Sequence, residues 1–412
     1  MKKLFIFALF NVCLCAFSVG AQEYKTVADG VEYAEYVREI EKLPVRMNLL
    51  RVDLTKVRLD VVHALDQAIG TETTSSMAKR HGAIAAVNAG FFRLDRSIFA
   101  GDAAGVLQID GKLLSETFGG RTALIIANDD AIIGTGAAIT GANSALFGGN
   151  ATLNHSKNRL TGGKANATRV AIANLESVSK LIVGTREFVG VGINRERKKD
   201  EIVVFTPEFN RTTLTDADGV EVVVRGGKIV EIRNGAGSCV IPADGFVVSA
   251  SGAKKAELLA AAQLKNRVAF AAEVFAESVS GDSTGGKYAV RGEDITNGVP
   301  QLIKNGAIDI TWEKEKSSQA FVETKHPRTA VAQLKDGKFL LMTVDGRSEK
   351  SAGIGLQHLA ELLLEFGATD AMNLDGGGST TMFLNGAIVN QPSDKEGERK
   401  VSDAVLVRPR RK

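Results

Sequence analysis

One stretch near the C-terminus organises the expected fold of this chain: Asp370-Ala371-Met372-Asn373-Leu374-Asp375-Gly376-Gly377-Gly378-Ser379-Thr380-Thr381-Met382. It begins as a short apolar strand, breaks at an acid followed by three glycines, and resumes as β-prone residues. Three consecutive glycines cost backbone entropy, so a fold keeps them where the main chain turns sharply or lies against something. A carboxylate beside backbone N–H groups and hydroxyls suits a ligand that carries phosphate or several hydroxyls. The alternative is a plain strand-to-strand turn, because Asp-Gly is a common turn pair.

The residues before the glycines predict a strand, a helix and a second strand. Residues 338–344 are apolar and β-prone, 352–366 repeat apolar residues at helical spacing, and 368–374 lead into the glycines. If the two strands are parallel neighbours, the crossover brings their C-terminal ends to one edge of the sheet. Asp345 and Asp375 follow those ends, so we expect two carboxylates about 5–10 Å apart, the separation that paired acids use in glycoside cleavage.

Two arginines are expected near these acids. Arg347 lies two residues past Asp345, and Arg328 begins the strand 328–334, which forms a hairpin with 338–344. A guanidinium suits phosphate because its planar fork donates two parallel hydrogen bonds. For Arg347, a salt bridge to a nearby acid is the alternative.

Two asparagines occupy matching places in a repeated pattern. Residues 82–88 and 367–373 share the pattern Gly-Ala-x-x-Ala-apolar-Asn, each after a predicted helix and before a turn that contains glycine. The repeat predicts that Asn88 and Asn373 lie at equivalent strand ends. For Asn88, the alternative is a cap that closes its own strand.

The rest of the chain predicts many strands and few helices. Four β-type segments between residues 201 and 248 indicate a β-rich insertion at about 195–250, and the polar stretch 140–170 reads as a long surface loop. We therefore predict an α/β (mixed α+β) fold, with a central mixed sheet, flanking helices and the β-rich insertion. Residues 22–412 are expected to form a single catalytic domain.

The first 21 residues predict export. A basic start, an apolar core and small residues ending at Ala21 are typical of a secretory signal peptide, and the apolar run is too short for a membrane span. Val12 and Leu14 precede the two leader cysteines where a lipid anchor needs a small residue, which disfavours a lipoprotein. We expect a periplasmic or extracellular protein without a membrane span.

Composition excludes some classes of function. Without Lys2 and Lys3, the 51 basic residues become 49, against 48 acidic residues, whereas a nucleic-acid-binding protein shows a basic surplus. The five histidines have no metal-ligand spacing, so no cofactor is expected, although a divalent cation stays an alternative. The oligomeric state is left open.

At these residues the sequence resembles the phosphodiester glycosidase family. The glycine-rich element is the specific part of the resemblance, and Ala89 departs from the family, which often has a second glycine there. The segments that carry the resemblance, in the family's order, are Ala86–Phe92, Arg328–Val331, Val344–Arg347, Asn373–Met382 and Asn390–Ser393, followed by Glu398, Arg399 and Val401.

The resemblance implies hydrolysis of a sugar 1-phosphodiester, with release of the sugar from a phosphate-bearing acceptor. Asp345 and Asp375 would be the catalytic pair, and Arg328 and Arg347 would bind phosphate. The remaining pocket residues would be Asn88, Asn373, Gly376, Gly377, Gly378 and Ser379. A surface polysaccharide or a teichoic-type polymer would be a suitable substrate.

Two functions of other classes remain open at this stage. The first is a non-catalytic glycan-binding protein that uses the same pocket. The second is a metal-dependent phosphodiesterase acting on a cell-surface polymer, in which Asp345, Asp370 and Asp375 hold a divalent cation.

Overall fold

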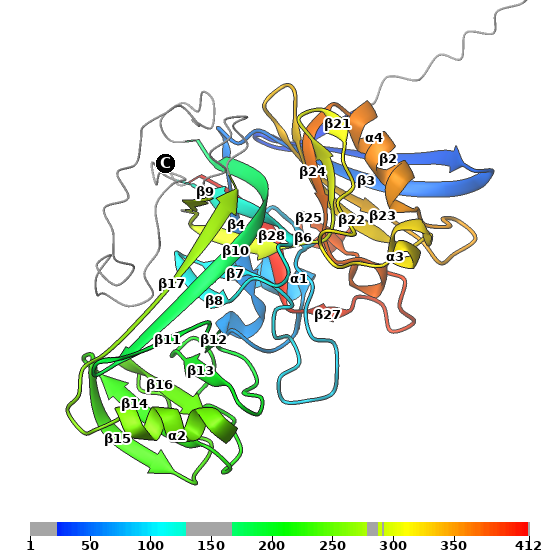
Figure 1. Ribbon diagram of the computed structural model, residues 1–412. Coiled ribbons are helices and arrows are strands. Elements are labelled where there is room, and N and C mark those ends of the chain that lie inside the picture. The colour runs from blue at the N-terminus through cyan, green and yellow to red at the C-terminus, as the bar shows by residue number, and fades with distance from the viewer. Residues whose placement is uncertain (1–22, 129–166, 278–286, 291, 411–412) are drawn as a thin grey trace, which may run out of the picture.

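The computed structural model describes residues 23–128, 167–277, 287–290 and 292–410. Strands dominate these residues and form five sheets, with few and short helices (Figure 1). The predicted mixed α+β fold therefore holds only coarsely. The predicted signal peptide at 1–21 lies outside the described residues, as does most of the polar loop 140–170.

Sheet I carries the strands nearest the glycine run. Its eight strands lie in the order β1 (Lys25–Ala28), β2 (Val31–Ile40), β3 (Leu43–Val52), β23 (Phe339–Val344), β22 (Arg328–Leu334), β24 (Ala368–Asn373), β20 (Gln301–Lys304) and β21 (Ala307–Ile308). Every neighbouring pair is antiparallel. The prediction of a central mixed sheet is thus wrong for this sheet.

The predicted strand–helix–strand unit exists, but its strands are not neighbours. β23, the helix α4 (Leu356–Glu365) and β24 follow one another along the chain. β22 lies between the two strands and pairs antiparallel with each, so β23 and β24 run in the same direction. Their C-terminal ends therefore meet one edge of sheet I, as predicted, but at two strand spacings, about 10 Å, rather than one.

Sheet IV packs against one face of sheet I. Its strands lie in the order β26 (Ala387–Ile388), β25 (Met382–Leu384), β6 (Ala85–Asn88), β28 (Asp403–Pro409) and β4 (Val57–His63). Leu50, Leu341, Val87 and Val405 belong to the apolar core between the two sheets. α4 covers the opposite face of sheet I through Leu356, Leu359 and Leu363, which are fully buried.

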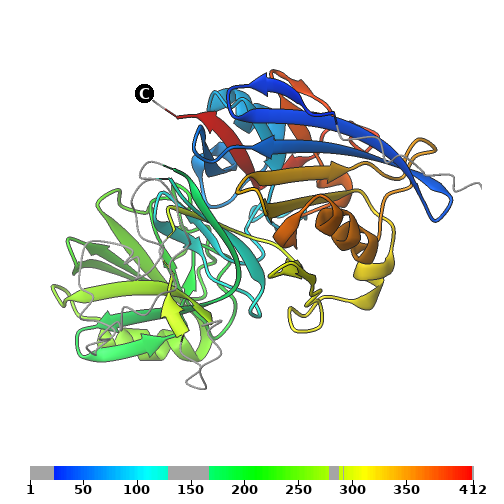
Figure 2. The same cartoon turned by 90° about the horizontal axis from the view of Figure 1, so that it is seen from above.

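Sheets II and III form the other end of the molecule (Figure 2). Sheet II has the order β18 (Lys287–Ala289), β17 (Val268–Glu277), β10 (Arg169–Val183), β9 (Thr122–Ala127), β19 (Asp294–Asn297), β7 (Leu107–Ile109) and β8 (Lys112–Ser115), and β11 (Arg186–Val189) pairs with β10. Sheet III has the order β12 (Gly192–Ile193), β13 (Ile202–Phe205), β16 (Gly245–Ala250), β14 (Val220–Arg225) and β15 (Lys228–Asn234), followed by the helix α2 (Gly252–Ala261). Sheet III occupies the predicted β-rich residues. Its β12 and β13 are a parallel pair.

The remaining elements are short. They are the two-stranded sheet V of β5 (Glu72–Thr73) and β27 (Lys400–Val401), the helices α1 (Thr74–Arg80) and α3 (Gln319–Glu323), and the 3-10 turns η1 (Ala64–Asp66) and η3 (Gly377–Ser379). Within the described residues, no helix is long and apolar enough to cross a membrane.

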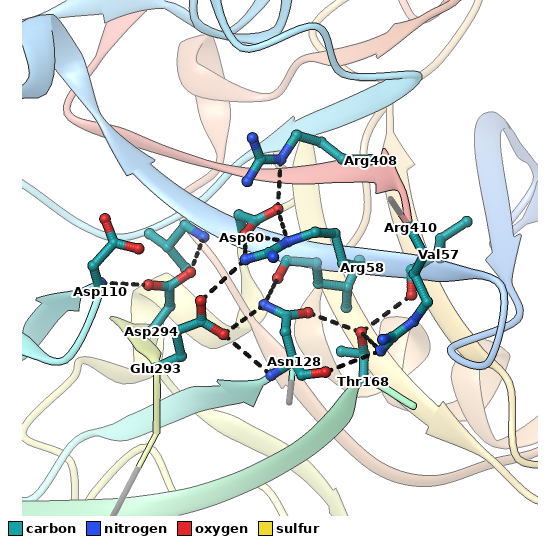
Figure 3. A network of polar contacts seen from close by, with 12 residues as sticks. Val57, Arg58, Asp60, Asp110, Asn128, Thr168, Glu293, Asp294, Arg408 and Arg410 are labelled. Atoms are coloured by element: carbon teal, nitrogen blue, oxygen red, sulfur yellow. Dashed lines mark hydrogen bonds and ion pairs between the residues drawn. The ribbon is translucent and has the colours of Figure 1, made fainter. Parts of the chain in front are cut away.

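A buried polar network joins sheet IV to sheet II (Figure 3). Asp60 on β4 accepts hydrogen bonds from Arg58 and from Arg408 on β28. Arg58 also reaches Glu293, next to β19, at 3.0 Å. Asp294 is 2% exposed, and each of its carboxylate oxygens accepts a backbone N–H group. These contacts fix the two ends of the molecule to each other.

Candidate functional site

The C-terminal ends of β23 and β24 and the N-terminal end of β22 define one edge of sheet I. Asp345 directly follows β23, and Asp375 lies two residues past β24. Arg328, the first residue of β22, is opposite Val344, and the N–H of Leu374 donates to the carbonyl of Thr329. The structure thus brings both predicted acids and Arg328 to the same edge.

Asp375 is half-buried, with its main chain held on both sides. Its N–H donates to the carbonyl of Ala89 at 2.9 Å, and its carbonyl accepts the side-chain amide of Asn88 at 2.6 Å. Burial raises the pKa of the Asp375 carboxyl to about 6, against the opposing effects of Ser379, the Gly376 N–H and Arg399. A carboxyl with this pKa ionises close to neutral pH, as a general base requires.

Asp345 is more deeply buried, at 1% exposure. Its Oδ1 accepts the Gln391 N–H at 3.0 Å and the Asn390 side-chain amide at 3.3 Å. Its Oδ2 has no hydrogen-bond partner in the described part of the chain, and the nearest cation is Arg46, 3.9 Å away. Burial raises the pKa of Asp345, and the hydrogen bonds from Gln391 and Asn390 offset part of that increase.

The glycine turn is closed rather than lined with free backbone donors. The N–H of Gly376 donates to Asp375 Oδ1, that of Gly377 to the carbonyl of Pro327, and that of Ser379 to the carbonyl of Gly376. The expectation that a row of bare N–H groups at this turn receives a ligand is therefore wrong for these positions, because the turn uses those donors itself. Gly377 has φ 61°, which explains glycine there.

The guanidinium groups of Arg347 and Arg399 lie against the glycine turn. A Cβ at Gly377 would lie 3.0 Å from Arg347 Nη2, and one at Gly378 would lie 2.1 Å from Arg399 Nη2. Arg399 is held by Asp394 through two hydrogen bonds of 2.7 and 3.0 Å. Both of these arginine atoms are the ends of flexible side chains, whereas a Cβ at Gly376 would lie 2.7 Å from the main-chain carbonyl oxygen of Pro327, so close approach requires glycine at that position.

Arg347 is the exposed arginine of the site. Its described contact is a 3.4 Å hydrogen bond from Nη1 to the Ser393 hydroxyl, and no salt bridge to it occurs among the described residues. The salt-bridge alternative for Arg347 finds no support in these contacts. Its guanidinium is available to an anion at the turn.

Arg328 lies at the predicted edge, but its side chain contacts the protein itself. It is 1% exposed, its Nε donates to the carbonyl of Ile354, and its Nη2 donates to the carbonyls of Phe321 and Thr324. The Phe321 ring lies 4.7 Å from the guanidinium carbon. The predicted bidentate phosphate contact is therefore not what this side chain makes: Nε and Nη2 are committed to backbone carbonyls around α3. Burial lowers its pKa to about 10.

Asn88 and Asn373 are buried connectors. Asn88 donates to the Asp375 carbonyl, and its Oδ1 accepts from the Thr329 hydroxyl and the Thr381 N–H. Asn373 donates to two backbone carbonyls, at 2.7 and 2.8 Å. Asn88, predicted to bind substrate, instead uses both side-chain groups to hold the acid and the turn in place.

Several buried polar atoms of this edge lack a partner within the described residues: Asp345 Oδ2, Asn373 Oδ1, Ser379 Oγ, Thr380 Oγ1 and Thr381 Oγ1. The Ser379 hydroxyl approaches Asp375 closely enough to lower the pKa of its carboxyl, but without hydrogen-bond geometry. Buried polar atoms are normally hydrogen-bonded, so a cluster of exceptions calls for an explanation. A bound ligand with hydroxyl or phosphate groups supplies one.

Sequence reasoning missed three residues of this edge. His326 was considered only as a metal ligand, Arg399 only as part of the family resemblance, and Asp394 not at all. The sequence could have pointed to His326, because it lies two residues before Arg328, in the segment that leads into β22. Asp394 and Arg399 lie in a loop, and no periodic pattern locates a loop in space.

The three aspartates of the metal alternative do not meet. Asp370 lies near the start of β24 and forms a 3.0 Å ion pair with Lys304, whereas Asp375 follows the end of that strand. Asp375 is five positions further along the chain, which corresponds to about 16 Å for an extended segment. A cation held jointly by Asp345, Asp370 and Asp375 is therefore excluded. Among the described residues, no group of three His, Cys, Asp or Glu side chains is arranged to hold a metal ion.

A cavity of about 370 Å³ lies away from the glycine turn. It is lined by charged side chains of the segments 93–102 and 195–198, namely Arg93, Asp102, Arg195, Glu196 and Lys198. Arg195 is already paired with Glu116 and Glu201. This cavity contains none of the predicted site residues.

Comparison with known proteins gives matches of two kinds. Residues 218–408 match the phosphodiester glycosidase family model, a range that includes Asp345, Arg347 and Asp375 but not Asn88. The N-acetylglucosamine-1-phosphodiester alpha-N-acetylglucosaminidase of Bos taurus is 39% identical over 109 residues, which are 24% of this chain and 20% of that protein. The match thus spans about a fifth of the curated relative's length.

Two solved structures share the fold. A hypothetical protein from Synechocystis superposes with a TM-score of 0.70 at 19% identity, covering 95% of this chain and 64% of that one. A putative exported protein from Burkholderia pseudomallei K96243 gives a TM-score of 0.67 at 23% identity, covering 89% and 74%. At these identities the likeness concerns the fold alone. The predicted resemblance to the phosphodiester glycosidase family is confirmed by the match over residues 218–408.

Proposed function

We propose that this protein is an exported glycosidase that hydrolyses a sugar 1-phosphodiester and releases the free sugar. The observation that carries the proposal is the pairing, at one turn, of a half-buried carboxyl ionising near neutral pH with an exposed guanidinium. Asp375 supplies the carboxyl and Arg347 the guanidinium. The family match supports hydrolysis of a sugar phosphodiester in general terms.

The proposed reaction assigns a separate task to each group. Water attacks the anomeric carbon and loses a proton to the Asp375 carboxylate. The bond between that carbon and the phosphate oxygen breaks, and its electron pair leaves with the phosphate. Arg347 offsets the negative charge on this leaving group, which needs less protonation than an ordinary alcohol because the charge spreads over the phosphate oxygens.

Asp345 and the unpartnered hydroxyls have binding roles in this proposal. The free Oδ2 of Asp345 accepts a sugar hydroxyl, and its charge stabilises positive character at the anomeric carbon. The Ser379 and Thr380 hydroxyls complete the pocket around the sugar. The substrate class would be a surface polysaccharide or polymer that carries a sugar joined through phosphate.

One experiment tests the reaction class. The purified protein is incubated with a sugar 1-phosphodiester, and the products are identified with and without a chelator. The proposal expects free sugar and an intact phosphate monoester of the acceptor under both conditions. Sugar phosphate as the product would mean cleavage of the P–O bond instead, and binding without turnover would mean a glycan-binding protein.

Export has its own test. The secreted protein is expected to begin at Gln22, without a lipid, in the periplasm or the medium. Mass spectrometry of the protein from cell fractions measures both features. Retention of residues 1–21, or an acyl chain on Cys13 or Cys15, would contradict this part of the proposal.

A further inference from the structure

His326 stands beside the glycine turn with its main chain fixed on two sides. Its N–H and C=O groups pair with Ile354, at 3.4 and 3.0 Å. The next carbonyl, that of Pro327, accepts the Gly377 N–H at 2.9 Å. The imidazole is therefore carried by a backbone that is tied directly to the glycine turn, against which the Arg347 side chain lies, and a Cβ at Gly346, the residue before Arg347, would lie 2.8 Å from the Pro327 nitrogen.

The imidazole is half-buried and incompletely paired. Its Nδ1 is buried and has no hydrogen-bond partner among the residues that the structure describes. A histidine that serves only packing usually satisfies its ring nitrogens. The ring thus keeps hydrogen-bonding capacity at Nδ1 that the described residues do not use.

The charges that act on this imidazole are positive. Arg328 belongs to the strand that His326 enters, and Arg347 belongs to the turn after β23. Burial first, and then these two cations, lower the pKa of His326. The charged side chains next to it along the chain have their own contacts: Lys325 pairs with Glu41 at 2.7 Å, and Glu323 accepts from Gln319.

We infer that His326 and Arg347 form an anion-recognition pair, in which the imidazole takes up a proton when a phosphoester binds. This inference rests on the proposed function and adds a group that recognises the phosphate. In the free protein the two arginines disfavour a third positive charge. A bound phosphate neutralises part of their field, so the imidazolium becomes stable and donates a hydrogen bond to a phosphate oxygen.

The affinity of this pair for an anion has a defined pH dependence. The anion raises the pKa of His326, so the bound state holds more protons than the free state between the two pKa values. By linkage, anion affinity must rise as the pH falls through that window, approaching about tenfold per pH unit for one proton. Asp375 also titrates near pH 6 at this turn, so the contribution of His326 is the part of the pH dependence that remains when Asp375 is replaced by Asn.

Sulfate is the probe for the test, because it keeps its charge over about pH 5–8, where histidine titrates. Calorimetric titration of the wild-type protein is done in two buffers of different ionisation enthalpy, at several pH values. We expect uptake of up to one proton per sulfate bound and tighter binding at lower pH. Zero proton uptake by the wild-type protein at every pH would overturn the inference, whatever the variants do.

Three variants test which residue takes up the proton and which residue binds the anion. His326→Gln is made in an Asp375→Asn background, because the Asp375 carboxyl also titrates near pH 6. There it should abolish the proton uptake and flatten the pH dependence, while weakening sulfate binding at low pH by about tenfold or more. His358→Gln is the matched control, since His358 lies on α4, 4.0 Å from Glu41, and should leave both unchanged. Arg347→Gln should lose sulfate binding at every pH. Proton uptake that persists in His326→Gln in that background would contradict the assignment.

Sulfate binding and turnover are separate measurements. If the protein binds sulfate with proton uptake but cleaves no sugar 1-phosphodiester, the proposed reaction is wrong and the anion site stands. If it cleaves the diester but takes up no proton with sulfate, the reaction stands and the role of His326 is wrong.

Discussion

Two polar regions of this molecule differ in how completely their side chains are satisfied. In the network of Figure 3, Asp60 accepts from two arginines, and Asn128 uses its amide and its carbonyl oxygen on Leu59, Glu293 and Thr168. At the glycine turn, Asp345 Oδ2 and the hydroxyls of Ser379 and Thr380 are buried without a partner in the described residues. Both regions are rich in charged groups, and in each of them buried side chains lie beside half-buried or exposed ones.

The difference separates structural polar groups from groups kept for a ligand. A satisfied buried network fixes the position of the elements that supply it, and losing one member is costly. Unpartnered polar atoms contribute nothing of this kind and are a cost in the free protein. The comparison therefore predicts that mutations in the first region change stability, whereas mutations in the second change turnover or binding.

The largest effect is expected for Asp375→Asn. The change keeps the side chain's size but removes the carboxylate, so turnover of a sugar 1-phosphodiester should fall by about 10²–10⁴-fold. Because the pKa of Asp375 is raised to about 6, ionisation of this group opposes folding above that pH. The variant should therefore melt no lower than wild type at neutral pH. Near-normal turnover in a folded variant would mean that Asp375 is only a turn residue.

The pH profile offers a second view of the same group. If the Asp375 carboxylate takes the proton from water, kcat/KM of the His326→Gln variant, in which the imidazole no longer titrates, should rise with pH and level off above about 6, the pKa of that carboxyl in the free protein. A rate that is flat through this range, or that falls with rising pH, would mean that another group limits the reaction.

Asp60→Asn is the corresponding change in the network. Burial alone would raise the pKa of Asp60, but the hydrogen bonds from Arg408 and Arg58 outweigh it and lower the pKa. The substitution should cost about 3 kcal/mol of unfolding free energy and leave turnover per folded molecule unchanged. Denaturant unfolding at neutral pH measures the loss.

The stability difference between wild type and Asp60→Asn at acidic pH supplies the control. A lowered pKa gives stability that is fully present above the unfolded value, about 3.9, and is lost as the pH falls through the folded value. The difference between wild type and variant should therefore shrink in acid. A difference in unfolding free energy that stays constant down to low pH would show that the charge of the Asp60 carboxylate does not stabilise the fold.

Arg347→Gln is expected to raise KM for the diester by about 10- to 100-fold, the worth of a charged hydrogen bond. The side chain is exposed, and its described protein contact is the Ser393 hydroxyl, so thermal unfolding should be unaffected. Arg328→Lys gives the contrast, because Arg328 holds backbone carbonyls: it should lower the melting temperature with little direct effect on phosphate. Steady-state kinetics together with melting curves of both variants decide between these roles.

The smallest effect comes from a matched pair of buried serines. Ser379 Oγ has no partner among the described residues, whereas Ser402 Oγ donates to Asp403 at 2.7 Å. Ser402→Ala should cost about 1 kcal/mol of stability, and Ser379→Ala should cost nothing in stability while raising KM several-fold. Equal stability losses in the two variants would remove the distinction between the regions.

The sequence predicted single strands well and their neighbours poorly. The predicted strands 328–334 and 338–344 correspond to β22 and β23 within a residue. Alternation and apolar runs report which face of a strand is buried, but not which strand lies beside it, so the insertion of β22 between β23 and β24 was not seen. The helix predicted at 352–366 begins only at Leu356, because Ile354 pairs with the main chain of His326.

The predictions for the site show the same limit: the positions of single residues were predicted well, and their contact partners poorly. Asp345 and Asp375 were placed at one edge from strand direction alone, which does not depend on the missing strand between them. Arg328 was misjudged because its acceptors are carbonyls of α3 and of the segment before α4, brought to it by tertiary packing. Asn88 was offered as a ligand residue or as a cap, and its contacts resemble the cap, reaching from β6 to the acid and the turn.

The strand pairings also determine when the site can form. β3 pairs with β23, and β4 pairs with β28, so sheets I and IV both need residues from the two extremes of the chain. The edge of sheet I that carries Asp345 and Asp375, the proposed catalytic edge, depends on these pairings. Sheet III closes on contacts between residues 192 and 250, which are local by comparison. Because contacts of large sequence separation form slowly, sheet III is expected to fold first and the catalytic edge last. A polypeptide lacking its final strand would then carry every predicted site residue and still have no assembled pocket.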